Sequence, residues 1–124
     1  MLGVSEEVRR GMTRAGEWDI YGRHLHPDTP SGGSVVLVHG MVVAGNGILP
    51  LARQLVARGL TVHVPDLPGF GRSAKPRRAL DVDGLADALA TWIKACELTR
   101  SSILGNSFGT QIAAAVADRH RGQA

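Results

Sequence analysis

The most regular feature of the chain is a set of short apolar runs that begins near residue 34. These runs carry β-branched side chains and almost no charge, which is typical of strands buried on both faces of a sheet. Each ends at a polar or glycine-containing segment, as Val38 does at His39-Gly40. We therefore predict short strands at 35–38, 61–65 and 101–104.

An amphipathic stretch follows each of these runs. Its apolar side chains recur at helical spacing, as Leu85, Leu89 and Trp92 do, and Gly59 stands where a left-handed C-terminal cap is expected. Helices are therefore predicted at 47–58, 81–97 and 108–119. Strands that alternate with helices call for right-handed crossovers, so the predicted fold class is α/β, a mostly parallel sheet with helices on both faces.

The first 30 residues are less regular. Large apolar side chains such as Trp18 and Leu25 alternate loosely with charged ones, which indicates one or two antiparallel strands within residues 8–26. A loop rich in Pro, Gly and Ser separates this part from the strand–helix units of residues 34–124. No linker or internal repeat follows residue 34, so we predict that the chain forms part of one domain.

Composition narrows the class of protein. The 124 residues are 44% hydrophobic, enough for a packed core. Cys96 is the single cysteine, and no histidine–cysteine cluster has metal-ligand spacing, so we expect neither a disulfide nor a metal. The N-terminus lacks the apolar run of a secretory signal, and no segment approaches the roughly 20 apolar residues that cross a bilayer. The expectation is a cytoplasmic protein without a membrane partner.

The charge of the chain does not point to nucleic acid. Net charge is +3 and the pI is about 9.8, but the arginines are scattered in pairs such as Arg9 with Arg10. A nucleic-acid-binding protein would concentrate them beside a recognisable reading motif.

Two glycine-rich segments are also set aside as cofactor sites. Residues 40–47 lack the lysine of a phosphate loop, and Lys75-Pro76 stops the helix that a dinucleotide fingerprint must open.

One motif carries chemistry. Gly105-Asn106-Ser107-Phe108-Gly109 matches the G-x-S-x-G nucleophile elbow, and it has a predicted strand before it and a predicted helix after it. A serine on such a sharp turn lifts its hydroxyl clear of the backbone, and side chains two residues to either side would collide, so both positions require glycine. The turn also points a helix N-terminus at the reacting group.

Together with two other segments, this motif resembles the serine-nucleophile branch of the α/β-hydrolase superfamily, specifically its N-terminal portion. The other segments are His39-Gly40 after the first buried strand and the Asp66-Leu67-Pro68-Gly69-Phe70-Gly71-Arg72-Ser73 loop. The resemblance implies that residues 1–124 form a partial α/β-hydrolase domain whose C-terminal part is absent. The Asn106 and Phe108 variant of the elbow is similar to that of hydrolases that cleave carbon–carbon bonds.

The resemblance also implies roles for individual residues. Ser107 would be the nucleophile, and the backbone amides of Met41 and Phe108 would form the oxyanion hole. His39, Gly40, Gly105 and Gly109 would support these groups without taking part in the chemistry. The implied substrate is a small molecule with an ester-like or carbon–carbon bond next to a carbonyl, and no metal or organic cofactor is implied.

The catalytic acid and histidine of that family follow the serine in the chain. Asp118 and His120 follow Ser107 here, but they lie on the helix that Ser107 begins, roughly 16 and 20 Å away. Neither can reach the hydroxyl, so the chain as given is expected to be inactive. The alternative is a non-catalytic remnant or interaction module that completes its sheet with a partner; the sequence leaves the oligomeric state open.

Overall fold

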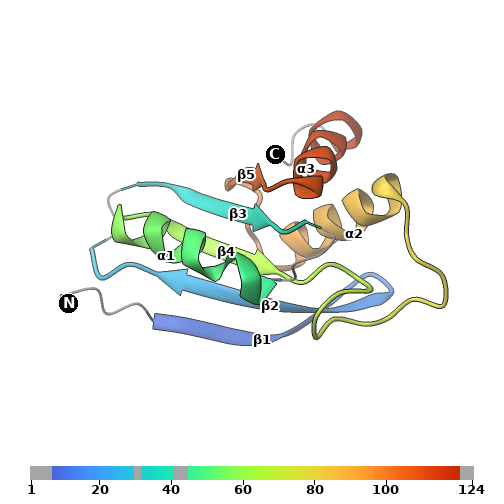
Figure 1. The fold of residues 1–124 in the computed structure, drawn as a ribbon, viewed down its shortest axis with the longest axis horizontal. Helices are drawn as coiled ribbons and strands as arrows, with labels where there is room; N and C mark the ends of the chain where they lie inside the picture. Colours follow the sequence, from blue (N-terminus) through green and yellow to red (C-terminus); the bar gives the residue numbers. More distant parts are fainter. Residues whose placement is uncertain (1–6, 30–31, 41–44, 121–124) are drawn as a thin grey trace.

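The computed structural model describes residues 7–29, 32–40 and 45–120. In chain order the elements are β1 (Glu7–Ala15), β2 (Trp18–His26), β3 (Ser34–Val38), a 3₁₀ turn η1 (Gly45–Ile48), α1 (Leu49–Ala57), β4 (Thr61–Pro65), α2 (Val82–Ala95), β5 (Ser102–Gly105) and α3 (Phe108–Arg119). Figure 1 shows α1 in front of the sheet and α2 behind it.

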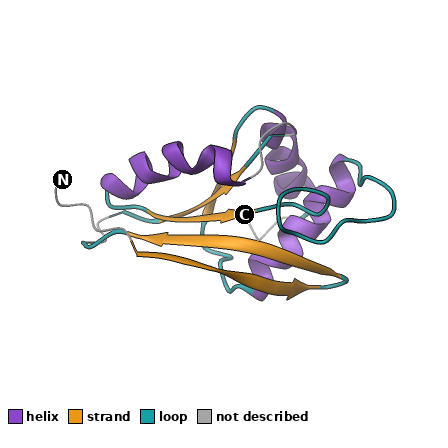
Figure 2. Ribbon diagram, turned by 60° about the horizontal axis from the view of Figure 1, so that its bottom comes forward, coloured by secondary structure: helices purple, strands orange, loops and turns teal. Residues whose placement is uncertain are grey.

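The five strands form one sheet in the order β1-β2-β4-β3-β5. β3 pairs in parallel with β4 and β5, whereas β2 pairs antiparallel with β1 and β4. Figure 2 shows β1 and β2 as a long hairpin along one side of this sheet. The predicted α/β class is therefore confirmed, and the sheet is mixed because this hairpin adds antiparallel pairs to the parallel strands.

Two apolar clusters hold the helices on opposite faces. Alternate residues of a strand face opposite sides, so Leu37 packs toward α1, whereas Val36 and Val38 pack toward α2 and α3. On the α1 side the cluster also contains Val62 and Val64 of β4. The prediction of helices on both faces is thus confirmed, and the sheet between them is buried as a parallel sheet requires.

The end of α1 matches the sequence pattern. Gly59 has φ +90°, and the amides of Gly59 and Leu60 donate to the carbonyls of Val56 and Leu55. This pair of bonds is a Schellman cap, which needs a residue in the left-handed conformation. The chain therefore turns directly into β4, and β3 and β4 end at the same edge of the sheet.

Candidate active site

Ser107 lies on the turn between β5 and α3, where the carboxyl ends of the parallel strands meet. Its backbone has φ 59° and ψ −122°, a conformation that residues with a side chain seldom adopt. Such a strained position occurs where the surrounding structure imposes it, and it is frequent at functional sites. The Ser107 side chain is exposed and makes no capping hydrogen bond to α3. The hydroxyl therefore projects away from the turn and is accessible.

The two glycines of the motif are required by close backbone approaches. A Cβ added to Gly105 would lie 2.3 Å from the carbonyl oxygen of Gly109. A Cβ added to Gly109 would lie 2.3 Å from the carbonyl oxygen of Val38, at the end of β3. Gly105 lets the turn fold on itself, and Gly109 lets α3 pack against β3, so both positions exclude a side chain.

Two backbone segments approach Ser107. A Cβ built on Gly40 would lie 3.4 Å from the Cβ of Ser107 and 3.7 Å from the Phe108 nitrogen, so the end of β3 adjoins the elbow. Phe108 is the first residue of α3, and its amide has no acceptor within the helix. The next two amides donate to Asn106 and Ser107 carbonyls. Met41, the second predicted oxyanion donor, lies outside the described residues.

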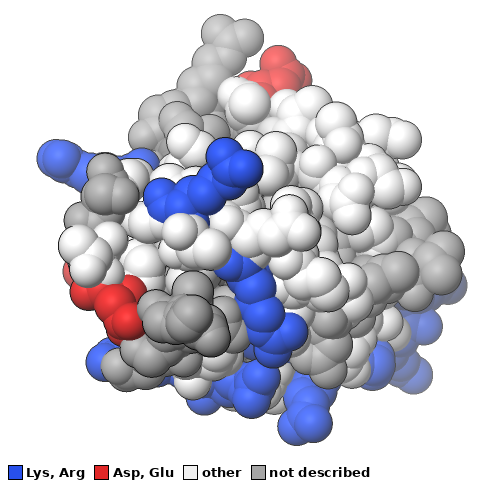
Figure 3. All heavy atoms as spheres, turned by 60° about the vertical axis from the view of Figure 1, so that its left-hand side comes forward, with Lys and Arg blue, Asp and Glu red and all other residues white. Residues whose placement is uncertain are grey.

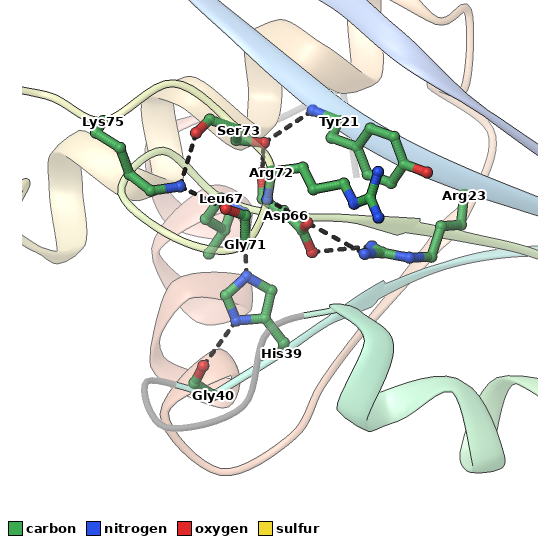
Figure 4. A network of polar contacts seen from close by, with 10 residues as sticks. All are labelled: Tyr21, Arg23, His39, Gly40, Asp66, Leu67, Gly71, Arg72, Ser73 and Lys75. Carbon is green, nitrogen blue, oxygen red and sulfur yellow. Dashed lines mark hydrogen bonds and ion pairs between the residues drawn. The ribbon is translucent and has the colours of Figure 1, made fainter.

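His39 links the end of β3 to the loop after β4 (Figure 4). Its Nε2 accepts a hydrogen bond from the Leu67 amide at 3.0 Å, which leaves the ring proton on Nδ1. Nδ1–H then donates to the Gly40 carbonyl at 2.7 Å. Burial lowers the pKa of His39, so the ring stays neutral. With both nitrogens occupied, His39 cannot serve as a base; it fixes the Gly40 carbonyl beside the elbow.

The loop that bonds to His39 is itself held by a buried ion pair. The Arg23 guanidinium on β2 donates to both carboxylate oxygens of Asp66, at 2.9 and 3.2 Å. Asp66 also accepts from the Arg72 amide at 3.0 Å, and Ser73 Oγ donates to the Asp66 carbonyl. A Cβ on Gly71 would overlap the Asp66 carboxylate, and Gly71 has φ +51°. The carboxylate therefore organises the whole loop (Figure 4).

The sequence alone did not predict the Arg23–Asp66 ion pair. Asp66 and Ser73 belong to the loop that carried the resemblance, but Arg23 stands 43 residues earlier, on a strand whose pattern is weak. Nothing local in the sequence pairs it with Asp66. An arginine inside an otherwise alternating strand was the available signal, because a cation that faces the core needs a partner.

No described histidine forms a hydrogen bond with the Ser107 hydroxyl. His120 Nε2 lies 2.6 Å from the Asp87 carboxylate on α2, at the far end of α3 from Ser107. His24 and His63 hydrogen-bond each other within the sheet. Within the described ranges, no group of three or more His, Cys, Asp or Glu side chains could hold a metal ion. Likewise, none of the described helices is long and apolar enough to cross a membrane.

Comparison with known proteins identifies the family of the chain. A family model described as the alpha/beta hydrolase fold matches residues 33–123, and the chain belongs to that family. It is 34% identical over 122 residues to 2-hydroxymuconate semialdehyde hydrolase from a Pseudomonas species, covering 94% of this chain and 40% of that protein. It is also 34% identical to 2-hydroxy-6-oxo-2,4-heptadienoate hydrolase from Pseudomonas putida, covering 96% of this chain and 42% of that protein.

Solved structures of hydrolases also superpose on this chain. A membrane phospholipase A superposes with a TM-score of 0.81 at 30% identity, covering 94% of this chain and 37% of the other. An epoxide hydrolase from Vigna radiata superposes with a TM-score of 0.81 at 14% identity, which shows the fold alone, and covers 94% and 37%. The chain therefore covers 37–42% of the length of these four hydrolases.

Proposed function

We propose that this chain is the nucleophile-bearing part of a serine hydrolase, with Ser107 as the attacking group. The observation that carries the proposal is the Ser107 backbone, φ 59° and ψ −122°, on a strand-to-helix turn where neither Gly105 nor Gly109 has room for a side chain. A nucleophile elbow has these properties because it must present a hydroxyl above the backbone.

The oxyanion would be held by backbone amides. The Phe108 amide opens α3, whose N-terminal partial charge favours a negative oxygen. The Met41 amide is the second donor on the strength of the sequence motif. His39 and Gly40 act as positioning residues, since the His39 ring fixes the Gly40 carbonyl next to Ser107. The oxyanion of a tetrahedral intermediate formed at Ser107 would then be stabilised by hydrogen bonds from amides already in place.

The substrate class is a small molecule with an ester-like or carbon–carbon bond adjacent to a carbonyl. The two Pseudomonas relatives are named as hydrolases of 2-hydroxymuconate semialdehyde and of 2-hydroxy-6-oxo-2,4-heptadienoate, which supports the carbon–carbon variant. The Asn106 and Phe108 variant of the elbow favours the same choice. A cytoplasmic location remains a prediction from the sequence.

The 124-residue chain alone should be inactive. Both nitrogens of His39 are occupied, and His120 is paired with Asp87 at the other end of α3. Without a base the serine is an ordinary alcohol, and loss of the triad histidine lowers kcat by on the order of 10⁶. Activity would require an acid and a histidine from a further segment of the domain.

Labelling with a fluorophosphonate probe tests this proposal. The chain alone should label no faster than its Ser107→Ala variant. Addition of the separately expressed C-terminal segment of the 2-hydroxymuconate semialdehyde relative should produce labelling that Ser107→Ala abolishes. Fast labelling of the chain alone would contradict the predicted inactivity, and labelling that survives Ser107→Ala would refute the choice of nucleophile.

A second candidate is a non-catalytic module that pairs its sheet with another chain. β5 lies at the end of the described sheet, and Leu104 on it is 44% exposed, a large apolar side chain beside an open strand edge. If this candidate is right, a partner will bind equally well to the Ser107→Ala variant, and no complementing segment will restore labelling.

A further inference from the structure

A row of polar side chains crosses the sheet beneath α2, away from Ser107. His24 on β2 and His63 on β4 are cross-strand neighbours, and their Nδ1 atoms lie 2.7 Å apart. His63 Nε2 lies 3.1 Å from Ser34 Oγ at the start of β3, and Ser34 Oγ lies 2.6 Å from Ser101 Oγ, just before β5. The row therefore joins β2, β4 and β3 and reaches the residue that precedes β5.

This row is enclosed by the α2 side of the core. The Trp92 ring stacks on His24 with centroids 5.7 Å apart and planes 13° from parallel. His63 is 5% exposed, and Trp92 is fully buried. The Trp92 indole N–H has no hydrogen-bond partner among the described residues. The histidines thus lie in a tightly packed region with little water to solvate a charge.

The geometry of the histidine pair limits how many protons it can hold. Two Nδ1 atoms 2.7 Å apart share one hydrogen, so one ring donates and the other accepts. One extra proton can be accommodated, because His63 can donate from both nitrogens, to His24 and to Ser34. A second extra proton would place two N–H groups against each other with no acceptor between them. The contact must then open.

The charges around the pair oppose even the first proton. Burial, followed by the positive charges of His24 and His26, lowers the pKa of His63 to about 4. Burial, His26 and Arg9 lower the pKa of His24. The groups that reach the pair from α2, β3 and the segment before β5 are Trp92, Ser34 and Ser101, which do not ionise. No described carboxylate bonds to the pair.

The surface near the His24–His63 pair is also mainly positive. The end of the molecule where β1 begins and β2 ends comes forward in Figure 3. Lys and Arg side chains are spread over that face, whereas Asp and Glu are visible only at its margins. A buried positive charge at the histidine pair would therefore gain little from its surroundings.

The pair occupies a short junction in the sheet. β2 meets β4 through the register Gly22 to Pro65 through Leu25 to Val62, and the His24–His63 contact lies within it. The β1–β2 hairpin is attached to the rest of the fold by this ladder, by the Arg23–Asp66 pair and by hydrogen bonds of Tyr21 to the loop after β4, and its Ile20 and Leu25 pack in the two apolar clusters. We propose that the His24–His63 pair is an acid-operated latch that holds the hairpin on the sheet and releases it when both rings are protonated.

The latch does not rest on the chemistry proposed for Ser107. Its release would nevertheless reach that site, because the hairpin carries Tyr21 and Arg23. The Tyr21 carbonyl accepts from the Asp66 amide at 2.8 Å, the Tyr21 amide donates to Ser73 Oγ at 2.8 Å, and Arg23 bonds the Asp66 carboxylate. A hairpin that leaves β4 would loosen the loop that holds His39.

Hydrogen exchange of the 124-residue chain between pH 7 and pH 4, corrected for intrinsic rates, tests the latch. Histidines whose pKa is lowered on folding stabilise the fold fully above their unfolded pKa near 6.5, and this stability declines as pH falls toward 4. Protection of the hairpin amides relative to α3 should fall reversibly by on the order of a hundredfold. His24→Gln with His63→Gln should remove this dependence, since glutamine hydrogen-bonds without titrating; His120→Gln should not.

Hairpin protection that persists at pH 4, or an unchanged acid response in the double variant, would overturn the proposal. If the double variant does not fold, NMR titration of the histidines in the unsubstituted chain decides the matter. Depressed pKa values for His24 and His63, with hairpin amide shifts that follow the same titration, support the latch. Ordinary pKa values near 6.5 refute it.

Discussion

Arg23 and Asp66 form an ion pair that is almost wholly buried, with 1% and 0% of their surfaces exposed. Arg23 also lies over the Tyr21 ring, with its guanidinium carbon 4.9 Å from the centroid. Through Asp66 and Leu67 this pair supports His39, and through His39 the carbonyl of Gly40. Individual buried charges thus hold in place the loops around Ser107, the proposed nucleophile.

Replacing Arg23 by methionine should destabilise the chain by roughly 3–5 kcal/mol, because it leaves the Asp66 carboxylate buried without its cation. Arg14→Met is the matched control. Arg14 pairs with Asp19 at 3.3 Å, but both side chains are more than half exposed, so its loss should cost about 1 kcal/mol or less. Urea unfolding measures the loss of stability in both variants. Equal midpoints would show that the buried pair stabilises the fold no more than the exposed pair does.

At the scale of elements, α1 and α2 end in the same type of cap, formed by different residues. After α2, the amides of Glu97 and Leu98 donate to the carbonyls of Lys94 and Ile93, as Gly59 and Leu60 do after α1. Glu97 has φ +58°, which is costly for a residue with a Cβ. α1 and α2 therefore share one cap geometry, and of the two only α1 has the glycine that suits it.

Glu97→Gly should consequently stabilise the chain by up to about 1 kcal/mol, since glycine adopts the left-handed conformation without steric cost. Gly59→Ala, at φ +90°, should destabilise it by a similar amount. Thermal unfolding of both variants checks the opposite signs. A Glu97→Gly variant with a lower Tm would mean that the glutamate side chain contributes more than the backbone strain removes.

The whole molecule combines two charge arrangements that respond to acid over different pH ranges with a third that does not respond. The histidine row responds first, below about pH 6.5. Asp87, which ties α2 to α3, responds later: hydrogen bonds from Arg119 and then His120 lower its pKa to about 2. The scattered Lys and Arg side chains of Figure 3 stay charged throughout. Acid should therefore loosen the hairpin before it separates the helices.

Asp87 provides a test of that order. Because its folded pKa is depressed, its stabilising contribution is present above the ordinary value of 3.8 and is lost as pH falls through about 2. Arg119→Gln combined with His120→Gln should return the Asp87 pKa toward 3.8, as followed by carboxyl NMR. Arg100→Gln, an exposed residue before β5, should leave it near 2. An unchanged pKa in the double variant would contradict the assigned cause.

Much of this architecture was predictable because its signals are local. The runs 35–38, 61–65 and 101–104 became β3, β4 and β5 within a residue of their expected bounds, since a buried strand needs only a short apolar segment between turns. The three helices followed from their periodic apolar faces. The elbow followed from two glycines at fixed spacing, whose necessity is visible in the 2.3 Å backbone approaches.

What the amino-acid pattern determined by itself was therefore the order of elements, the cap at Gly59 and the position of Ser107, all of which depend on neighbours within a few residues. Only the tertiary structure decided that Arg23 pairs with Asp66 and that His24 meets His63. Those partners stand 43 and 39 residues apart, and strand order and register bring them together. Pairing across a sheet depends on how whole strands align, and no short segment of sequence records it.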